Sequence, residues 1–336
     1  MLRIGYPVYS LATYDEDNTI LVAGGGGKAK TGVENAISVV KVLSNELELV
    51  KKHPFPDCVS MVATSHDKKH ISAFVGPDVM LFDQDFKEIS KFSTPMASMI
   101  GKCMAFSPND DILLIIDGDF TLYLLKVPTL EVIASRSPDK NEETMKIIPT
   151  RACFHGNGES IVLVLSNEKK TTLNKPIEGF PEIASLKGSF GIETKSIYSL
   201  GDSIIINGIN TKLKQTAILL MKESKGTLMN THVVKPTFGV VTSMVPTKKS
   251  IATGTNEGDV YLLNKSSLGR MRVTKRVHGF PVTSMIDCGD VIVSGSLDAT
   301  IKITPNKEKS FQITLLISIV ILAIAVLLQI IRFINK

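Results

Sequence analysis

Short hydrophobic runs and polar separators alternate along most of the chain. The runs are rich in Val, Ile, Leu and Thr, and clusters of Gly, Pro, Asn and Asp separate them. Examples are VYSLAT, TILVAGG, HISAFVG, DVMLFD, DILLIID and SIVLVL. Runs of this length and composition are typical of β-strands, and the separators are typical of turns. Hardly any helical period interrupts the series over residues 1–309, so we predict an all-β domain there.

The strand-rich region repeats itself with a period of about 40 residues. Val-Thr-Ser-Met occurs at 241–244 and again at 282–285, and Ala252–Thr255 stands where Val293–Ser296 does. Each unit consists of a strand, a second strand, a turn containing Asp or Asn and a third strand, which is the layout of a WD-type blade. This spacing predicts a seven-bladed WD-type β-propeller. The blades should begin near residues 5, 57, 101, 150, 195, 240 and 281, with the fourth and fifth least well defined.

Three polar residues of the last unit, His278, Ser294 and Asp298, have the composition of a hydrolase triad. In WD-type blades, residues of these types at these relative positions form a buried hydrogen-bond network, and we predict that role here. The Trp that completes the network is absent, because Thr304 stands in its place and the chain has no Trp.

The pair His66 and His70 in HDKKH invites a metal interpretation. A zinc-protease motif needs Glu directly after the first His, and Asp67 stands there instead. We therefore predict a solvated turn between strands.

Residues 311–331 read FQITLLISIVILAIAVLLQII and contain no charged side chain. A helix of this length matches the roughly 30 Å thickness of the bilayer core, and it lacks the polar face of a buried helix in a soluble domain. We therefore predict one C-terminal transmembrane helix over residues 310–331, which contacts the membrane through residues 311–331, and a short lumenal tail at 332–336. The N-terminal segment lacks the apolar run of a signal peptide, so the propeller of residues 1–309 is expected in the cytosol.

Charge and cysteine content narrow the range of functions. The formal net charge is only +5, which gives no electrostatic footprint for nucleic acid, and we expect no nucleic-acid partner. The four cysteines, Cys58, Cys103, Cys153 and Cys288, lie far apart and lack the spacing of metal ligands. We expect reduced thiols in the core, which fits a reducing compartment.

One segment departs from the pattern of short turns. Residues 23–37, AGGGGKAKTGVENAI, separate two strands of the first unit and contain five glycines. Glycines give a backbone access to conformations that other residues avoid, so such a loop can approach an ion or a partner closely. A nucleotide-binding P-loop is excluded because Ala29 follows Gly27-Lys28 and no helix follows. A functional insertion and a long loop without function both remain open.

The pattern Gly-Gly-Gly-Gly-x-x-Lys-x-Gly-x-x-Asn is carried by Gly24–Gly27, Lys30, Gly32 and Asn35. It resembles the loop of the endoplasmic-reticulum guanine nucleotide exchange factors for the small GTPase of the COPII coat, the family that includes the prolactin regulatory element-binding protein. The predicted architecture also resembles theirs. The resemblance covers the whole chain in layout but only about 30 N-terminal residues in specific sequence.

The resemblance implies an exchange factor in the endoplasmic reticulum membrane that opens the nucleotide site of this GTPase and starts vesicle budding. Exchange requires preferential binding to the nucleotide-free state and no covalent chemistry, so the protein would not be an enzyme in the covalent sense. The resemblance also implies a potassium ion, K+, held mainly by backbone oxygens of the loop. The implied metal site is Gly26, Gly27 and Asn35.

Roles for the remaining loop residues follow from the same resemblance. Val33 is expected to be an apolar wedge at the loop tip, and Asn35 to brace the loop or help hold the ion. Lys30 is expected to steer toward acidic switch residues or phosphates. The glycines, Gly32 among them, are expected to let carbonyl groups converge on the cation.

A membrane-tethered propeller scaffold or adaptor without exchange activity is the alternative, because propellers are common interaction platforms. The loop discriminates between the two functions. A scaffold should tolerate replacement of residues 24–35 by a short turn, and an exchange factor should not.

Overall fold

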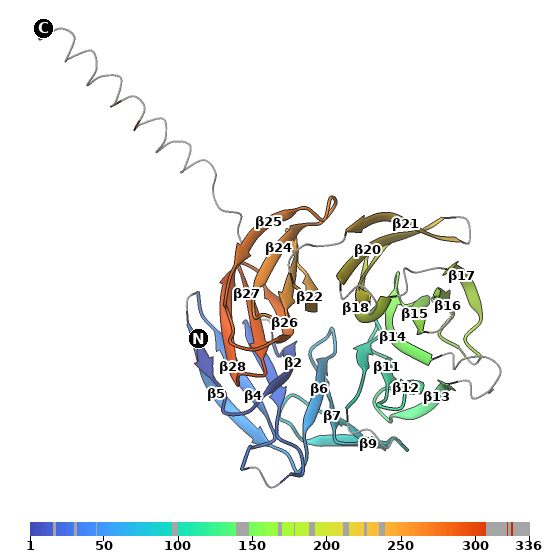
Figure 1. The fold of residues 1–336 in the computed structure, drawn as a ribbon. Coiled ribbons are helices and arrows are strands. Elements are labelled where there is room, and N and C mark those ends of the chain that lie inside the picture. The colour runs from blue at the N-terminus through green and yellow to red at the C-terminus, as the bar shows by residue number, and fades with distance from the viewer. Residues whose placement is uncertain are drawn as a thin grey trace, which may run out of the picture.

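The structure, a computed structural model, is built from strands that form a ring (Figure 1). The described residues are 1–15, 18–29, 32–44, 46–95, 100–138, 148–166, 170–177, 179–187, 192–210, 215–224, 227–234 and 239–306, together with 321 and 324. Within them the strands group into seven blades of four strands, which confirms the predicted all-β propeller. The fourth and fifth blades are joined into one eight-stranded sheet by a single parallel pair, Ser185 with Thr227.

Each blade is an antiparallel sheet whose first strand lies innermost. The first two blades are β2 (Val8–Thr13), β3 (Thr19–Gly24), β4 (Ala36–Val42) and β5 (Leu47–Pro54), and β6 (Val59–Thr64), β7 (Ile71–Val75), β8 (Asp78–Phe82) and β9 (Glu88–Ser93). The next two are β10 (Cys103–Phe106), β11 (Ile112–Ile116), β12 (Leu122–Lys126) and β13 (Glu131–Arg136), and β14 (Ile148–His155), β15 (Ser160–Ser166), β16 (Lys170–Asn174) and β17 (Glu182–Lys187). The fifth and sixth are β18 (Ile192–Leu200), β19 (Ser203–Asn210), β20 (Gln215–Ser224) and β21 (Thr227–Val234), and β22 (Val241–Pro246), β23 (Ser250–Thr255), β24 (Val260–Asn264) and β25 (Arg270–Thr274).

The seventh blade joins the two ends of the domain. It contains β26 (Val282–Cys288), β27 (Val291–Ser296) and β28 (Thr300–Pro305), and β1 (Leu2–Arg3) supplies its outermost strand. Leu2 pairs with Ile301, and the Ile4 amide donates to the Ala299 carbonyl at 2.9 Å. The sequence predicted a closed array but did not identify the strand that closes it.

The predicted blade positions are confirmed, including those of the poorly defined fourth and fifth blades. Each innermost strand begins within three residues of its predicted start. The second strands are buried on both faces, and every residue of β3, β7 and β23 is buried. This double burial explains why these strands are short continuous apolar runs and not alternating patterns.

All seven innermost strands begin at one face of the ring, which we call the loop face. Gly24, at the end of β3, pairs with Val8 at the start of β2, so the Gly-rich loop from β3 to β4 lies on this face. The opposite face carries the turns between first and second strands. The chain leaves the propeller at the opposite face, because β28 starts at the loop face and Asn306, directly after it, bonds to Gly289 and Asp290 in such a turn.

The predicted membrane segment falls almost entirely outside the described residues. Of residues 311–331 only Ile321 and Ile324 are described, and both are helical and more than half exposed, at 61% and 54%. Within the part of the chain that the structure describes, no helix is long and apolar enough to cross a membrane. The transmembrane helix and the tail at 332–336 stay predictions.

Candidate functional site

The Gly-rich loop leaves β3 through two glycines that have no room for a side chain. A Cβ on Gly24 would lie 1.9 Å from the Pro7 carbonyl oxygen, and a Cβ on Gly25 would lie 2.2 Å from Asn35 Oδ1. Gly25 also has a φ of +146°, which L side chains rarely adopt. The backbone here packs directly against the segment before β2 and against the returning end of the loop.

Asn35 closes the base of the loop. Its Oδ1 accepts from the Gly27 amide at 2.8 Å, and its Nδ2 donates to the Gly27 carbonyl at 3.1 Å. The side-chain amide thus imitates a pair of backbone hydrogen bonds across the loop. The Asn35 carbonyl accepts from the Phe55 amide at 2.9 Å, which ties the loop to the segment directly after β5. Two side-chain and one backbone hydrogen bond therefore fix the position of Asn35.

A buried carboxylate lies under the loop. The Asp57 side chain is 4% exposed, and its Oδ1 accepts from the Cys58 amide at 2.7 Å. Its Oδ2 has no hydrogen-bond partner among the described residues and lies 3.4 Å from the Nζ of Lys28 in the loop. Asp57 was not among the residues predicted from the sequence. The signal that could have found it is an acid two residues before the start of an innermost strand, β6.

The other predicted loop residues lie in different environments. Val33 is half-buried and packs against the core cluster that contains Ile4, Tyr6 and Val8, so the structure does not place it at an exposed loop tip. Gly32 is exposed, has a φ of +75°, and has open space where a Cβ would be. Lys30 lies outside the described residues. The structure thus brings Gly25, Gly27 and Asn35 together and sets Val33 beside the first blade.

The thiols are held in the protonated form. Cys58 Sγ lies 3.8 Å from the Gly25 carbonyl, and burial together with Asp57 raises the pKa of this thiol to about 11. Burial raises the pKa of Cys288 to about 12 and also raises that of Cys103 and Cys153. All four cysteines are free and half-buried, as expected of reduced thiols, and none has the thiolate character of a nucleophile.

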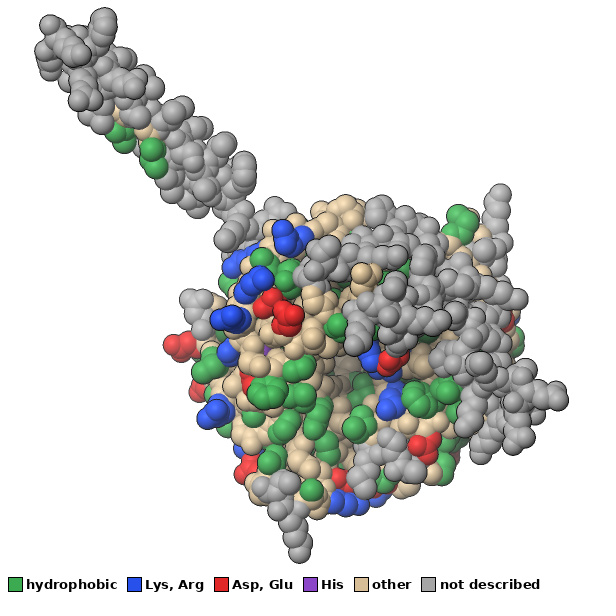
Figure 2. Space-filling model, in the orientation of Figure 1, with side chains coloured by type: hydrophobic (Ala, Val, Ile, Leu, Met, Phe, Trp, Pro, Cys, Tyr) green, Lys and Arg blue, Asp and Glu red, His purple; other side chains and the backbone are tan. Residues whose placement is uncertain are grey.

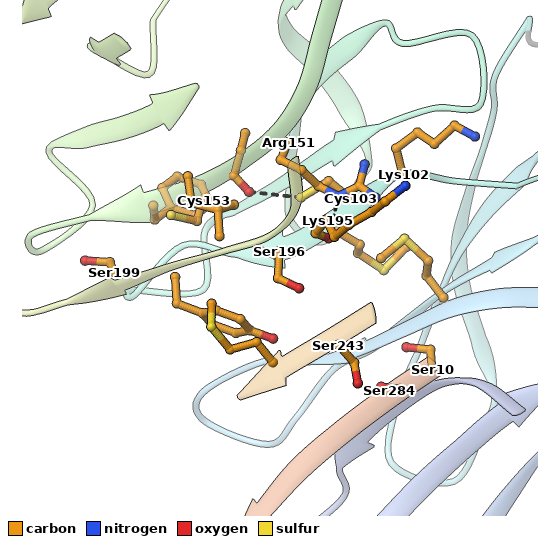
Figure 3. A pocket seen from close by; sticks show the side chains of 18 of the residues that line it. Ser10, Lys102, Cys103, Arg151, Cys153, Lys195, Ser196, Ser199, Ser243 and Ser284 are labelled. Atoms are coloured by element: carbon orange, nitrogen blue, oxygen red, sulfur yellow. Dashed lines mark hydrogen bonds between the residues drawn. The ribbon is translucent and has the colours of Figure 1, made fainter. Parts of the chain in front are cut away.

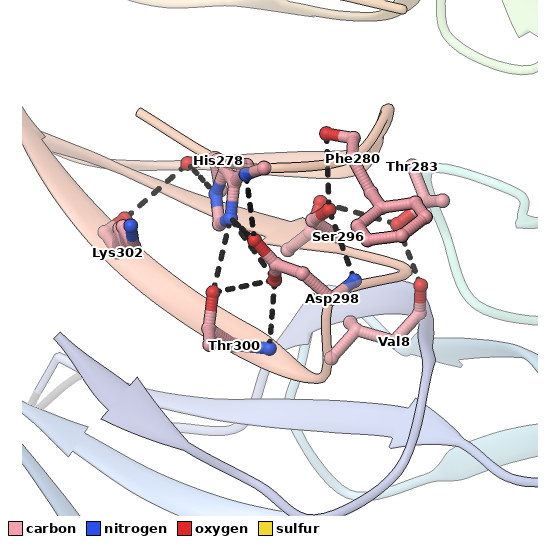
Figure 4. A network of polar contacts seen from close by, with 11 residues as sticks. Val8, His278, Phe280, Thr283, Ser296, Asp298, Thr300 and Lys302 are labelled. Atoms are coloured by element: carbon pink, nitrogen blue, oxygen red, sulfur yellow. Dashed lines mark hydrogen bonds and ion pairs between the residues drawn. The ribbon is translucent and has the colours of Figure 1, made fainter. Parts of the chain in front are cut away.

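His278, Ser294 and Asp298 form the predicted network in the last blade (Figure 4). His278 Nε2 lies 2.9 Å from Ser294 Oγ, and Nδ1 lies 3.2 Å from Asp298 Oδ2. Asp298 also accepts from the Gly279 amide and from Thr300. The His278 side chain is fully buried, and this burial lowers its pKa despite the neighbouring carboxylate. The network ties the segment before β26 to the β27–β28 turn, and its three residues do not line the central cavity of the ring.

His66 and His70 lie in the turn between β6 and β7, as predicted. The His66 side chain is 60% exposed and its Nδ1 lies 2.9 Å from Asp110 Oδ1 of the third blade. Among the described residues, no group of three or more His, Cys, Asp or Glu side chains is placed to hold a metal ion.

A comparison with protein-family models matches residues 270–304 to the model described as WD domain, G-beta repeat. The matched segment runs from β25 to β28 and contains the whole His278 network. No curated protein matches the chain. The fold and this match together show a WD-type propeller, the architecture of an interaction scaffold.

Proposed function

We propose that the chain is a guanine nucleotide exchange factor for the small GTPase of the COPII coat, and that it acts at the endoplasmic reticulum membrane. The observation that carries the proposal is the Gly-rich loop. It is a long insertion in the first blade, it carries the sequence pattern that resembles this family, and its base is fixed by Asn35 and Gly27.

A preorganised loop suits an exchange factor. A GTPase holds its nucleotide through magnesium and switch-loop contacts, and exchange requires a partner that binds better when these contacts are open. A loop that is already ordered loses little conformational entropy on insertion, so more of its contact energy favours the open state. The Asn35–Gly27 pair and the close packing of Gly24 and Gly25 supply that order at the base.

Val33 would act from a half-buried position. Its contact with the cluster around Tyr6 and Val8 sets the direction of the loop, and its exposed part is what could meet an apolar surface of the GTPase. Gly32, beside it, is exposed and is free of steric neighbours within 4 Å of a Cβ position. Lys30 keeps its proposed role in steering toward acidic switch residues or phosphates.

We propose that the residues at the loop base hold a monovalent cation. Gly26, Gly27 and Asn35 offer carbonyl and amide oxygens, and the buried Asp57 Oδ2 adds a carboxylate oxygen without a hydrogen-bond partner among the described residues. Hard oxygen donors of this kind suit K+. A bound K+ would supply charge compensation for Asp57 and a fixed loop conformation. Lys28, whose side chain is 64% exposed, provides part of that compensation through its ion pair.

The test is nucleotide release from the COPII GTPase loaded with a fluorescent guanine nucleotide, measured with the full chain in potassium and in sodium buffer. We expect acceleration in potassium, a weaker effect in sodium, and loss of acceleration in Val33→Asp and Asn35→Ala. Val50→Asp is the matched control, because Val50 is an exposed valine on β5 of the same blade, at 59%. It should leave release unchanged.

The same assay separates exchange from scaffolding. No acceleration in either buffer, with the GTPase still bound, would identify the protein as a propeller scaffold. Tolerance of a short turn in place of residues 24–35 would give the same result. Normal exchange by Val33→Asp would remove Val33 from the mechanism and leave the rest of the proposal in place.

A further inference from the structure

We propose that the central channel of the propeller binds a small polyanion carrying phosphate groups, at the mouth that opens on the loop face. The channel encloses a cavity of about 1170 Å³, lined by innermost strands of the blades. Cavities that bind small ligands are typically about 300–1,000 Å³, so this one has room for a multiply phosphorylated small molecule. The site is separate from the Gly-rich loop and goes beyond the exchange function.

Serine hydroxyls line much of the channel at one level. Innermost strands of six blades carry a β-bulge near their start. The residue after the bulge is Ser10, Met61, Arg151, Ser196, Ser243 or Ser284. Ser10 bonds to the Val62 backbone and Ser284 accepts from the Leu11 amide, so two of these serines bridge neighbouring strands. Arg151 occupies the equivalent position in the fourth blade.

Three cations converge where this level meets the loop face (Figure 3). Lys102 directly precedes β10, Arg151 lies on β14 and Lys195 lies on β18, and all three line the cavity. Because the innermost strands all begin at the loop face, these positions share one end of the channel. Figure 2 shows Lys and Arg side chains beside the centre of the ring, near one acidic group.

The positive charge is only partly compensated. Lys195 pairs with Glu193 on its own strand, whereas neither Lys102 nor Arg151 forms an ion pair with a described residue. The acids that act on them from a greater distance are Asp119 on Lys102 and Glu193 on Arg151. The Lys102 ammonium lies 5.3 Å from the centre of the Phe120 ring. Burial, and next the neighbouring Arg151, lower the pKa of Lys102. A bound anion would relieve this repulsion and supply the missing partner.

Arg151 is oriented for recognition of an anion. Its Nε donates to the Lys195 carbonyl at 3.0 Å and its Nη1 donates to the Thr150 carbonyl at 2.6 Å. These bonds fix the guanidinium plane and leave donors over for a ligand, since the group has five N–H donors. A planar fork held in this way matches phosphate geometry better than a flexible ammonium would.

The cavity also has a charge gradient along its length. The far end of the channel is lined by Glu159 and Asp202, so the cavity is polarised and an anion would be held at the loop face.

The test uses inositol hexakisphosphate as the probe and isothermal titration calorimetry of the full chain in uncharged detergent micelles. We expect saturable binding at one site. Arg151→Gln and Lys102→Met should each weaken it about tenfold. Lys41→Gln is the matched control, because Lys41 is an exposed lysine on β4, and it should bind as the unsubstituted chain does.

The two variants place the substitution in different structural settings, because Lys102 lies outside any strand and Arg151 lies within β14. Loss of binding by both is therefore not explained by damage to one strand. Pyrophosphate and vesicles containing a phosphoinositide distinguish a free phosphate compound from a lipid headgroup, and binding of either by the same residues supports the site. Absence of binding at millimolar probe would overturn the proposal. Equal affinity of Arg151→Gln, Lys102→Met and Lys41→Gln for inositol hexakisphosphate would also overturn it. Tighter binding of a polyglutamate peptide than of inositol hexakisphosphate would overturn it as well.

Discussion

His278 shows how a single buried side chain fastens a blade of this propeller. It contacts Ser294 on β27 and Asp298 in the turn before β28, and the segment before β26 carries it. The hydroxyl of Thr304, where a Trp would extend the network, is buried without a hydrogen-bond partner among the described residues. The His278 network therefore stabilises the blade without the hydrogen bond of a Trp.

We predict that His278→Ala lowers the free energy of unfolding by about 2–3 kcal/mol, because it removes a buried imidazole together with its contacts to Ser294 and Asp298. Urea denaturation at pH 7.5 measures the change. The control is His66→Ala, since the His66 side chain is 60% exposed and its loss should cost far less. Equal effects of the two variants would contradict a fastening role for His278.

The same residue should make stability depend on pH. Burial lowers the pKa of His278 in the folded state, so the unfolded chain binds the proton more readily. The contribution is present above the unfolded pKa of about 6.5 and is lost as the pH falls below it. His53 and His155 also have lowered pKa values. Both residues are present in the unsubstituted chain and in His278→Ala, so their effect cancels when the two are compared. The free energy of unfolding of the unsubstituted chain and of His278→Ala is measured by urea denaturation from pH 7.5 to 5. The difference between the two should shrink as the pH falls.

Gly25 and Gly32 lie in the same loop but differ in the space available for a side chain. At Gly25 a Cβ would collide with Asn35, whereas at Gly32 nothing lies within 4 Å. We expect Gly25→Ala to cost about 2–3 kcal/mol and to open the Asn35–Gly27 pair, and Gly32→Ala to cost about 1 kcal/mol for its positive φ alone. Thermal unfolding and protease cleavage within residues 24–35 measure both. Equal cleavage of the two variants would show that the loop base is not packed as described.

At the scale of elements, the ring depends on a two-residue strand. β1 pairs with β28, and its neighbours extend the contact, because Ile4 is buried and the Tyr6 hydroxyl donates to the Val22 carbonyl at 2.8 Å. Without β1 the outer edge of β28 would expose unpaired backbone groups, which favours edge-to-edge association.

We predict that deleting residues 2–4 lowers the thermal transition by several degrees and increases aggregation on heating. Light scattering during a thermal ramp measures both. Arg3→Ala is the control, because the Arg3 side chain is exposed and the substitution retains the backbone pairing with Thr300. If the deletion behaves like Arg3→Ala, closure does not depend on β1.

At the scale of the whole molecule, the repeated blades could be predicted from the sequence, whereas the features that occur only once in the fold could not. The apolar runs and the recurrence of Val-Thr-Ser-Met predicted seven blades, because each blade must bury its second strand on both faces. The closing strand β1 was missed because two residues carry no pattern. Asp57 and the cationic channel were missed for a different reason, since Lys102, Arg151 and Lys195 come together only when three blades are placed side by side.

The Gly-rich loop was located correctly, and its internal geometry was not predictable. The resemblance implied that Asn35 braces the loop or helps to hold an ion; the structure gives it two hydrogen bonds to Gly27, and its role in exchange stays a prediction. The half-buried position of Val33 depends on the cluster that Ile4 and Tyr6 build from the N-terminal segment. Nothing in the loop's own sequence encodes that cluster.

The face at which the chain leaves the ring predicts how the propeller is oriented relative to a membrane. The chain leaves the propeller at Asn306, on the face opposite the Gly-rich loop, and the apolar run begins at residue 311. The four residues between span at most about 14 Å when fully extended. If residues 311–331 cross the bilayer, the opposite face must lie close to the membrane, and the loop face and channel mouth must point away from it.

We predict this orientation for the full chain in lipid vesicles. Fluorescent labels at Lys248→Cys, in a turn of the opposite face, and at Leu297→Cys, in a turn of the loop face, report the distance to acceptor lipids by energy transfer. Transfer should be clearly stronger from position 248, with the unsubstituted chain as the control for labelling of its four half-buried cysteines. Reversed transfer would mean that the loop face meets the bilayer, where a soluble GTPase could not reach it, and equal transfer would mean that neither face is held closer to the bilayer. The proposed exchange function therefore depends on this outcome as well as on the loop.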